Sequence, residues 1–145
     1  MARSGRPGGA VPLIGLLVAI AGVVLLIAGV VTYAVVSSTL SDQHITVSED
    51  ADNFAGQHVD QPWEAYAEAS VIAEHASEMA DGKTYAELPR DDPRRESVMT
   101  ASFLQASLFT SVVAFGVAAL AAGLGILFVL IGISLRRVAR APAAP

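Results

Sequence analysis

Residues 11–36 read VPLIGLLVAIAGVVLLIAGVVTYAVV, a run of 26 residues without a charged side chain. A second apolar run, SVVAFGVAALAAGLGILFVLIGISL, occupies residues 111–135. A helix needs about 20 apolar residues to cross the hydrocarbon core of a bilayer. The two runs therefore predict two membrane-spanning helices, one over residues 12–39 and one over residues 111–135, that form a transmembrane helical hairpin.

The composition of the whole chain agrees with a membrane protein. Of its 145 residues, 53% are hydrophobic and only 16% are charged, whereas soluble domains contain about 25% charged residues. This argues against a soluble enzyme, a disordered chain and a nucleic-acid-binding protein. The chain has no cysteine, which excludes disulfides, thiolate metal sites and lipidation on cysteine.

The charges are divided unequally along the chain. The N-terminal tail (residues 1–11) has a charge of +2 and the C-terminal tail (136–145) has +3, whereas residues 42–96 hold all 14 acidic residues against four basic ones, a net −10. Short flanks rich in Lys and Arg stay in the cytoplasm. We therefore expect both termini to be cytoplasmic and residues 40–110 to be extracytoplasmic. An outward-facing segment without disulfides is more usual in bacteria, which favours a multi-pass protein of the bacterial plasma membrane.

A cleaved signal peptide is the alternative interpretation of the first apolar run. Arg3 and Arg6 would then form its basic region, and residues 36–38 would be a weak cleavage site. However, the apolar part of a signal peptide is about 7–15 residues long, much shorter than the 26 residues present. The length favours an uncleaved span.

The acidic segment, residues 40–92, is predicted to contain one helix and a weak hairpin. Residues 44–47 and 54–59 have strand-like composition, although no tight-turn dipeptide joins them. Asp60 or Gln61 is the expected cap of an amphipathic helix over residues 60–81, which Gly82 would close. The predicted fold is thus mainly α, with a small acidic α(+β) segment beside the hairpin.

A long final helix is predicted to begin after Asp92, with Asp92 as its cap and Pro93 as its first residue. Running to about Leu135, it would be too long for a bilayer alone. Residues 93–110 would then form a helical stalk outside the membrane, on which the acidic segment packs. Tyr33 is expected either at the outer membrane interface or against a neighbouring helix.

Small residues recur at intervals that place them on one helix face. Seven-residue spacing links glycines in both apolar runs, and a small-xxx-small pair adds to the second run. Small side chains on one face allow helices to approach closely. The predicted helix-packing residues are Gly15, Gly22, Gly29, Gly116, Ala119 and Gly123, with Gly125 and Gly132 sharing the same spacing. The contact could join the two helices of one chain or two copies of it.

Four ionisable residues of the acidic segment fall on roughly one helix face: Glu64, Glu68, His75 and Glu78. One interpretation is a divalent-cation or pH-responsive patch. The other is an ordinary solvated acidic surface. An iron site built from two histidines and one carboxylate has its residue types here, but no ligand-like spacing selects them.

Two stretches carry a family resemblance: ITVSEDADNFAGQHVDQPWEAYAEASVIAEHASEMADGKTYAEL and DPRRESVMTASFLQASLFTSVVAFGVAALAAGLG. From Ile45 to about Gly132 the chain resembles a family of small actinobacterial two-helix membrane proteins of unknown function. Members often bear the label of aromatic ring-opening dioxygenase small subunit. The resemblance implies two membrane helices. The dioxygenase subunit, however, is a soluble helical protein whose enzyme carries its iron ligands on the large subunit, so no catalytic, cofactor-binding or metal-binding residue is carried over.

These observations favour a non-enzymatic protein without cofactors. No GxSxG, Walker, HExxH or GxGxxG motif is present, and neither apolar run contains Asp, Glu, Lys, Arg or His. We expect an accessory or scaffold subunit of a larger cell-envelope complex, with the bilayer and other membrane subunits or itself as partners, and no nucleic acid. The alternatives are a metal-dependent dioxygenase-related subunit and an extracytoplasmic module that responds to cations or pH.

Overall fold

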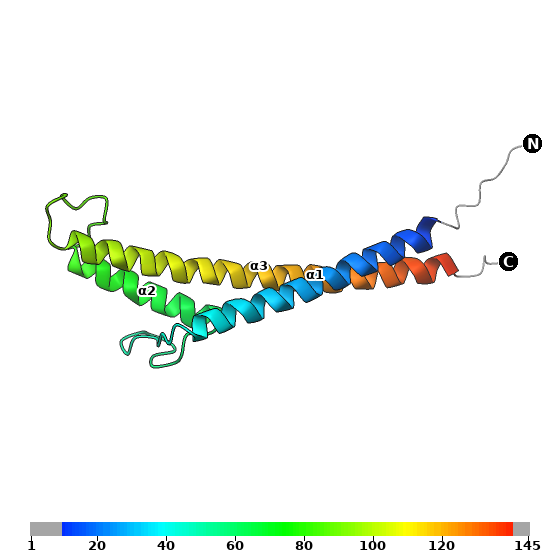
Figure 1. The fold of residues 1–145 in the computed structure, drawn as a ribbon, viewed down its shortest axis with the longest axis horizontal. Helices are drawn as coiled ribbons and strands as arrows, with labels where there is room; N and C mark the ends of the chain where they lie inside the picture. The colour runs from blue at the N-terminus through cyan, green and yellow to red at the C-terminus, as the bar shows by residue number, and fades with distance from the viewer. Residues whose placement is uncertain (1–9, 141–145) are drawn as a thin grey trace, which may run out of the picture. The chain divides into compact units, whose positions relative to one another are not determined.

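The computed structural model describes residues 10–140. These residues form three helices, α1 (Ala10–Ser41), α2 (Pro62–Met79) and α3 (Arg95–Arg140) (Figure 1). No β-strand forms within the described range, so the fold is mainly helical. By length and composition, α1 and α3 could each cross a membrane. The outer parts of both predicted tails, residues 1–9 and 141–145, lie outside the described residues.

Helix α1 extends two residues beyond the predicted span at each end. Pro12 lies in its first turn, where a missing N–H costs no hydrogen bond because the first four N–H groups have no partner within the helix. The helix ends at Ser41, and the N–H of His44 donates to the Ser41 carbonyl at 3.0 Å. His44 itself has a φ of 53°, a left-handed conformation that stops further helical hydrogen bonding.

Helix α2 begins after Gln61, its N-cap residue, and Pro62 occupies the first helical position. The Glu64 carboxylate accepts the Gln61 N–H at 2.9 Å, as in a capping box. At the other end, the N–H of Gly82 donates to the Ser77 carbonyl at 2.8 Å. Asp81, with φ of 54°, is therefore the first left-handed residue after the helix. The predicted closing residue, Gly82, follows it, with φ of 78°.

Helix α3 begins at Arg95, two residues later than predicted. Asp92 does accept a backbone N–H, but from Arg94 at 2.9 Å, and the N–H of Arg95 donates to the Asp92 carbonyl at 3.1 Å. Pro93 therefore belongs to a turn that leads into the helix. At 46 residues, α3 is about 69 Å long at ~1.5 Å per residue.

The predicted hairpin between residues 44 and 59 is reduced to one antiparallel bridge, Thr46 to His58. Three backbone hydrogen bonds surround it, from Val47 to Gln57, from Gly56 to Val47 and from Val59 to Ile45. Without a tight turn to fix a longer register, pairing stops there. The bridge still serves packing, because the side chains of Val47 and Val59 are fully buried.

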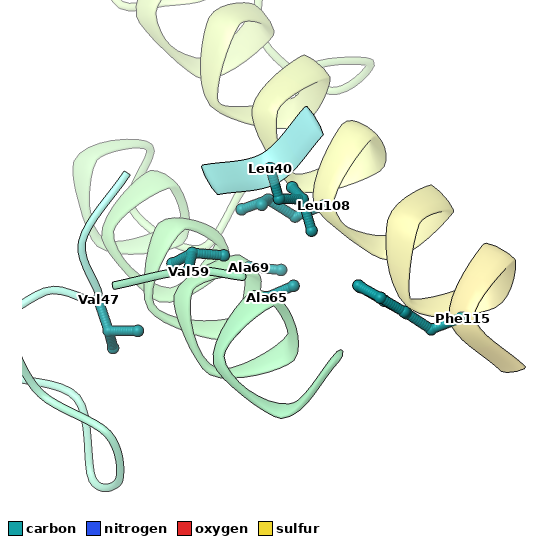
Figure 2. Close-up of a cluster of buried hydrophobic side chains, with 7 residues drawn as sticks. All are labelled: Leu40, Val47, Val59, Ala65, Ala69, Leu108 and Phe115. Atoms are coloured by element: carbon teal, nitrogen blue, oxygen red, sulfur yellow. The ribbon is translucent and has the colours of Figure 1, made fainter. Parts of the chain in front are cut away.

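The chain divides into two compact units, and α1 and α3 contribute to both. Unit 1 comprises the chain up to Thr32 and from Val117 onward, and unit 2 comprises Tyr33–Gly116. The core of unit 2 brings together side chains from all three helices and the bridge: Leu40, Val47, Val59, Ala65, Ala69, Leu108 and Phe115 (Figure 2). In Figure 2, Leu40 of α1 lies beside Leu108 of α3.

Tyr33 packs against this core instead of standing free at an interface. Its ring centroid lies 4.7 Å from that of Phe115, and its hydroxyl donates to Gln61 Oε1 at 2.7 Å. The structure thus favours the neighbouring-helix interpretation of Tyr33. Since Gln61 is the N-cap residue of α2, the contact also joins the beginning of that helix to α1.

Candidate functional site

Three glycines of α1 lie directly against the backbone of α3 within unit 1. A Cβ added to Gly15 would lie 2.8 Å from the Gly132 carbonyl oxygen, and one added to Gly29 would lie 2.6 Å from that of Ala118. Between them, a Cβ on Gly22 would lie 2.7 Å from the Gly125 oxygen. The partners descend by seven along α3 as the glycines ascend by seven along α1. The helices are therefore antiparallel, with a repeating backbone contact.

The other predicted packing residues of α3 do not take part. A Cβ on Gly116 or on Gly123 would have no atom within 4 Å, and Ala119 is exposed. The contact uses Gly125 and Gly132, the second pair with seven-residue spacing. Because each residue turns a helix by about 100°, Gly123 lies about 160° away from Gly125, on the far side of the helix.

Glu64 and Glu68, two members of the predicted acidic patch, are buried. They are 6% and 8% exposed, and each accepts hydrogen bonds from fixed donors. Glu64 receives the indole N–H of Trp63 at 2.9 Å in addition to its capping bond. Glu68 receives the backbone N–H of Ser48 at 2.7 Å and its hydroxyl at 3.0 Å. Because both carboxylates are buried, the interpretation of a solvated acidic surface is wrong for these two residues. Their hydrogen bonds instead hold the chain before α2 to that helix.

His75, the third member, is exposed and pairs with a residue outside the patch. Its Nε2 lies 2.6 Å from Asp50 Oδ2. The hydrogen bond that the His75 ring donates to the Asp50 carboxylate raises the pKa of His75 above its usual value of 6.5. The same bond lowers the pKa of Asp50 below 3.8. The pair joins the loop between the two bridged residues, Thr46 and His58, to the second half of α2.

The four patch residues are therefore not brought together as one site. Glu78 is exposed and makes no side-chain hydrogen bond within residues 10–140, while Glu64 and Glu68 point into unit 2 and His75 turns to Asp50. No group of three or more His, Asp or Glu side chains in this described range is arranged to hold a metal ion.

A separate cluster of charges holds the connection between α2 and α3. Arg94 contacts Asp81 at 2.7 Å and Asp92 at 2.9 Å. Its hydrogen bonds lower the pKa of Asp92 to about 2, and the two carboxylates together raise the pKa of Arg94. Next to it, Arg95 lies 4.0 Å from the ring centroid of Tyr85 and donates to the Leu88 carbonyl. These contacts close the connection over a small core of Ala80, Leu88 and Val98.

Several cavities of unit 2 are large enough for small molecules, which typically occupy about 300–1,000 Å³, and two of these measure about 540 and 610 Å³. One, of about 540 Å³, lies between the end of α1, the middle of α2 and the first half of α3, and is mainly apolar, with Leu40, Leu108 and Glu68 in its wall. The second, of about 610 Å³, lies between the loop that follows Thr46 and the first four turns of α2. Its wall contains three aromatic residues and three acidic residues.

The sequence alone did not predict the residues that bind Glu68 and His75, or the aromatic residues that line the second cavity. Ser48 binds Glu68 from 20 residues away, and Asp50 binds His75 from 25 residues away. No local sequence pattern predicts such pairs. The aromatic residues of the second cavity, Phe54, Trp63 and Tyr66, are separated by nine and three positions and follow no single period. One signal was available: Tyr66 follows Trp63 by three residues, which places both on one side of α2.

No protein-family model, curated protein or solved structure matches this chain.

Proposed function

We propose that this chain is a two-span membrane protein that serves as an accessory or scaffold subunit of a larger envelope complex. The observation that carries the proposal is the exposure of its apolar helices. In the most apolar 18-residue window of α1, and in that of α3, only 17% of residues are buried. The core helix of a soluble protein is mostly buried, so these side chains require an apolar surrounding, which a bilayer supplies.

The antiparallel glycine contact supports a hairpin of two spans over a cleaved leader. A signal peptide has no structural reason to match its glycines with those of a helix 100 residues later. A Cβ on either Gly22 or Gly125 would lie 2.7 Å from the carbonyl oxygen of the other, so the contact requires glycine at both positions. In lipid, where apolar burial gives no preference for helix contact, such close packing is what holds helices together.

The charge distribution supports the orientation. Arg136, Arg137 and Arg140 follow the apolar part of α3, and Arg3 and Arg6 precede α1. In the proposed topology all five lie in the cytoplasm, and the acidic residues 40–110 lie outside the membrane. The plasma membrane of a bacterium is the proposed location.

The accessory role is tested by purification of the full chain in mild detergent, with its associated proteins identified. We expect other membrane proteins in fixed stoichiometry. A matched pair of variants sharpens the test of partner binding. Gly123→Leu places a side chain on the face of α3 that no described residue covers, and should reduce the amount of associated protein that is purified with the chain. Leu120→Met leaves the shape of the helix nearly unchanged and should not. If the parent purifies only as a monomer or with itself, the accessory role is wrong.

A metal-dependent dioxygenase-related subunit is the competing proposal, taken from the resemblance. His44 and His58 have ring centroids 6.2 Å apart, and His58 also lies 3.4 Å from the Ser41 hydroxyl. Metal analysis of the purified protein distinguishes the two proposals. Stoichiometric iron that is lost in a His44→Ala, His58→Ala double variant would favour the dioxygenase-related subunit.

A further inference from the structure

The second cavity of unit 2 combines aromatic and acidic side chains in one wall. Its volume is about 610 Å³, within the usual range for small-molecule sites. Three aromatic and three acidic residues line it, namely Phe54, Trp63, Tyr66, Asp50, Asp52 and Glu74. No Lys or Arg is among the lining residues.

Contacts outside the cavity hold two of the aromatic rings in place. The Trp63 indole N–H donates to the buried Glu64 carboxylate at 2.9 Å. The Tyr66 ring packs edge-on against Phe109, with centroids 5.6 Å apart and planes at 75°. Even so, Trp63 is 50% exposed and Tyr66 is 56% exposed. Both rings are therefore held in fixed orientations while about half of each side chain stays exposed. This is expected of a preformed binding surface and not of a core, where the rings would be covered.

The carboxylates give the cavity negative charge. Asp50 is engaged by His75 at 2.6 Å, whereas Asp52 and Glu74 form no ion pair with any residue between 10 and 140. No three acidic or histidine side chains in that same range are close enough to hold a metal ion. A larger cation with an apolar surface fits this lining, because its charge attracts the separated carboxylates and its apolar groups contact the aromatic side chains.

We propose that this cavity binds a small organic cation of the quaternary ammonium class. The negative faces of aromatic rings attract such cations, and clusters of aromatic residues are a known means of binding them. Asp52 and Glu74 would supply the opposite charge. The inference does not depend on the membrane topology, because every residue that it uses belongs to unit 2.

Trp63 is the only tryptophan of the chain, so its fluorescence reports directly on this cavity. The full chain in an uncharged detergent is titrated with choline at constant ionic strength. The matched ligand is the neutral alcohol in which carbon replaces the choline nitrogen. We expect saturable fluorescence change with choline, and at least about tenfold weaker binding of the alcohol, since cation–π and ionic attraction are both lost.

Two charge-matched double variants test the site. Asp52→Asn with Glu74→Gln removes the cavity charges at exposed positions, and should weaken choline binding by about tenfold. Asp42→Asn with Glu96→Gln removes the same charge elsewhere on unit 2, and should change binding less than about twofold because distant exposed charges are screened. Tyr66→Leu should also weaken binding while it retains Trp63 as the reporter.

Any one of four results would overturn the proposal. The first three are that the alcohol binds as tightly as choline, that the two double variants bind choline equally well, and that choline causes no saturable change in Trp63 fluorescence. Tighter binding of an arginine-rich peptide than of choline would also overturn it, because the cavity would then be the docking site of a basic protein segment. Circular dichroism of each variant separates loss of binding from loss of fold.

Discussion

Gly22 of α1 and Gly125 of α3 contact each other reciprocally through their backbones. A Cβ added to either residue would lie 2.7 Å from the carbonyl oxygen of the other, closer than real Cβ atoms approach a non-bonded atom. Gly15 and Gly132 repeat the relationship seven residues away on each helix, at 2.8 and 2.5 Å. The pairing of α1 with α3 in unit 1 therefore depends on the absence of side chains at these positions.

Gly22→Leu should separate the two helices and destabilise the hairpin by about 1–3 kcal/mol, the usual cost of forcing extra atoms into a packed contact. Val23→Leu is the matched control, because Val23 is 45% exposed and one residue round the helix. The measurement is thermal unfolding and oligomer size in detergent. Equal effects of the two substitutions would mean that the glycine contact carries no special stability.

The two glycine pairs of α3 should respond differently to the same change. Gly125→Leu should destabilise as Gly22→Leu does, since an added Cβ would lie 2.5 Å from the Leu26 backbone nitrogen. Gly123→Leu should leave the unfolding midpoint of the isolated chain within error or raise it slightly, because glycine disfavours a helix by about 1 kcal/mol. Comparable losses for both variants would show that α3 packs through another face.

Ser48→Ala should destabilise unit 2 by about 1–3 kcal/mol, because it removes a donor from the buried Glu68 carboxylate. Ser77→Ala is the control, a serine of α2 that is exposed and whose side chain makes no hydrogen bond to any residue from 10 to 140. Chemical denaturation followed by Trp63 fluorescence measures both. If Ser48→Ala is as stable as the control, the backbone N–H of Ser48 alone satisfies Glu68.

The His75–Asp50 contact should make the stability of unit 2 depend on pH. The pKa of His75 is raised above 6.5, so its contribution is full below pH 6.5 and is lost as the pH rises through the raised value. The pKa of Asp50 is lowered below 3.8, so its contribution is present above pH 3.8 and is lost on further acidification. The contact is thus most favourable between these two values.

Nuclear magnetic resonance titration of His75 checks this directly. Asp50→Asn should return its pKa toward 6.5, whereas Asp52→Asn, two residues away, should leave it raised. A His75 pKa at or below 6.5 in the parent protein would contradict the contact.

The helices were predictable from sequence because their causes are local. Long uncharged runs define α1 and the apolar part of α3, and Gln61 with Pro62 and Glu64 marks the start of α2. The choice between Gly123 and Gly125 was not predictable, since both belong to pairs spaced by seven and only the facing helix distinguishes them. The burial of Glu64 and Glu68 was not predictable either, because the pattern of one helix cannot reveal donors such as Ser48, which approach from a distant loop.

Cysteine accessibility in intact cells tests the proposed topology most directly, because the chain has no cysteine of its own. Single cysteines replace Asn53, which is exposed on unit 2, and Ala141, which follows the basic end of α3. An impermeant thiol reagent should label Asn53→Cys in intact cells and Ala141→Cys only after the cells are opened. Labelling of Ala141→Cys but not of Asn53→Cys in intact cells would contradict the account.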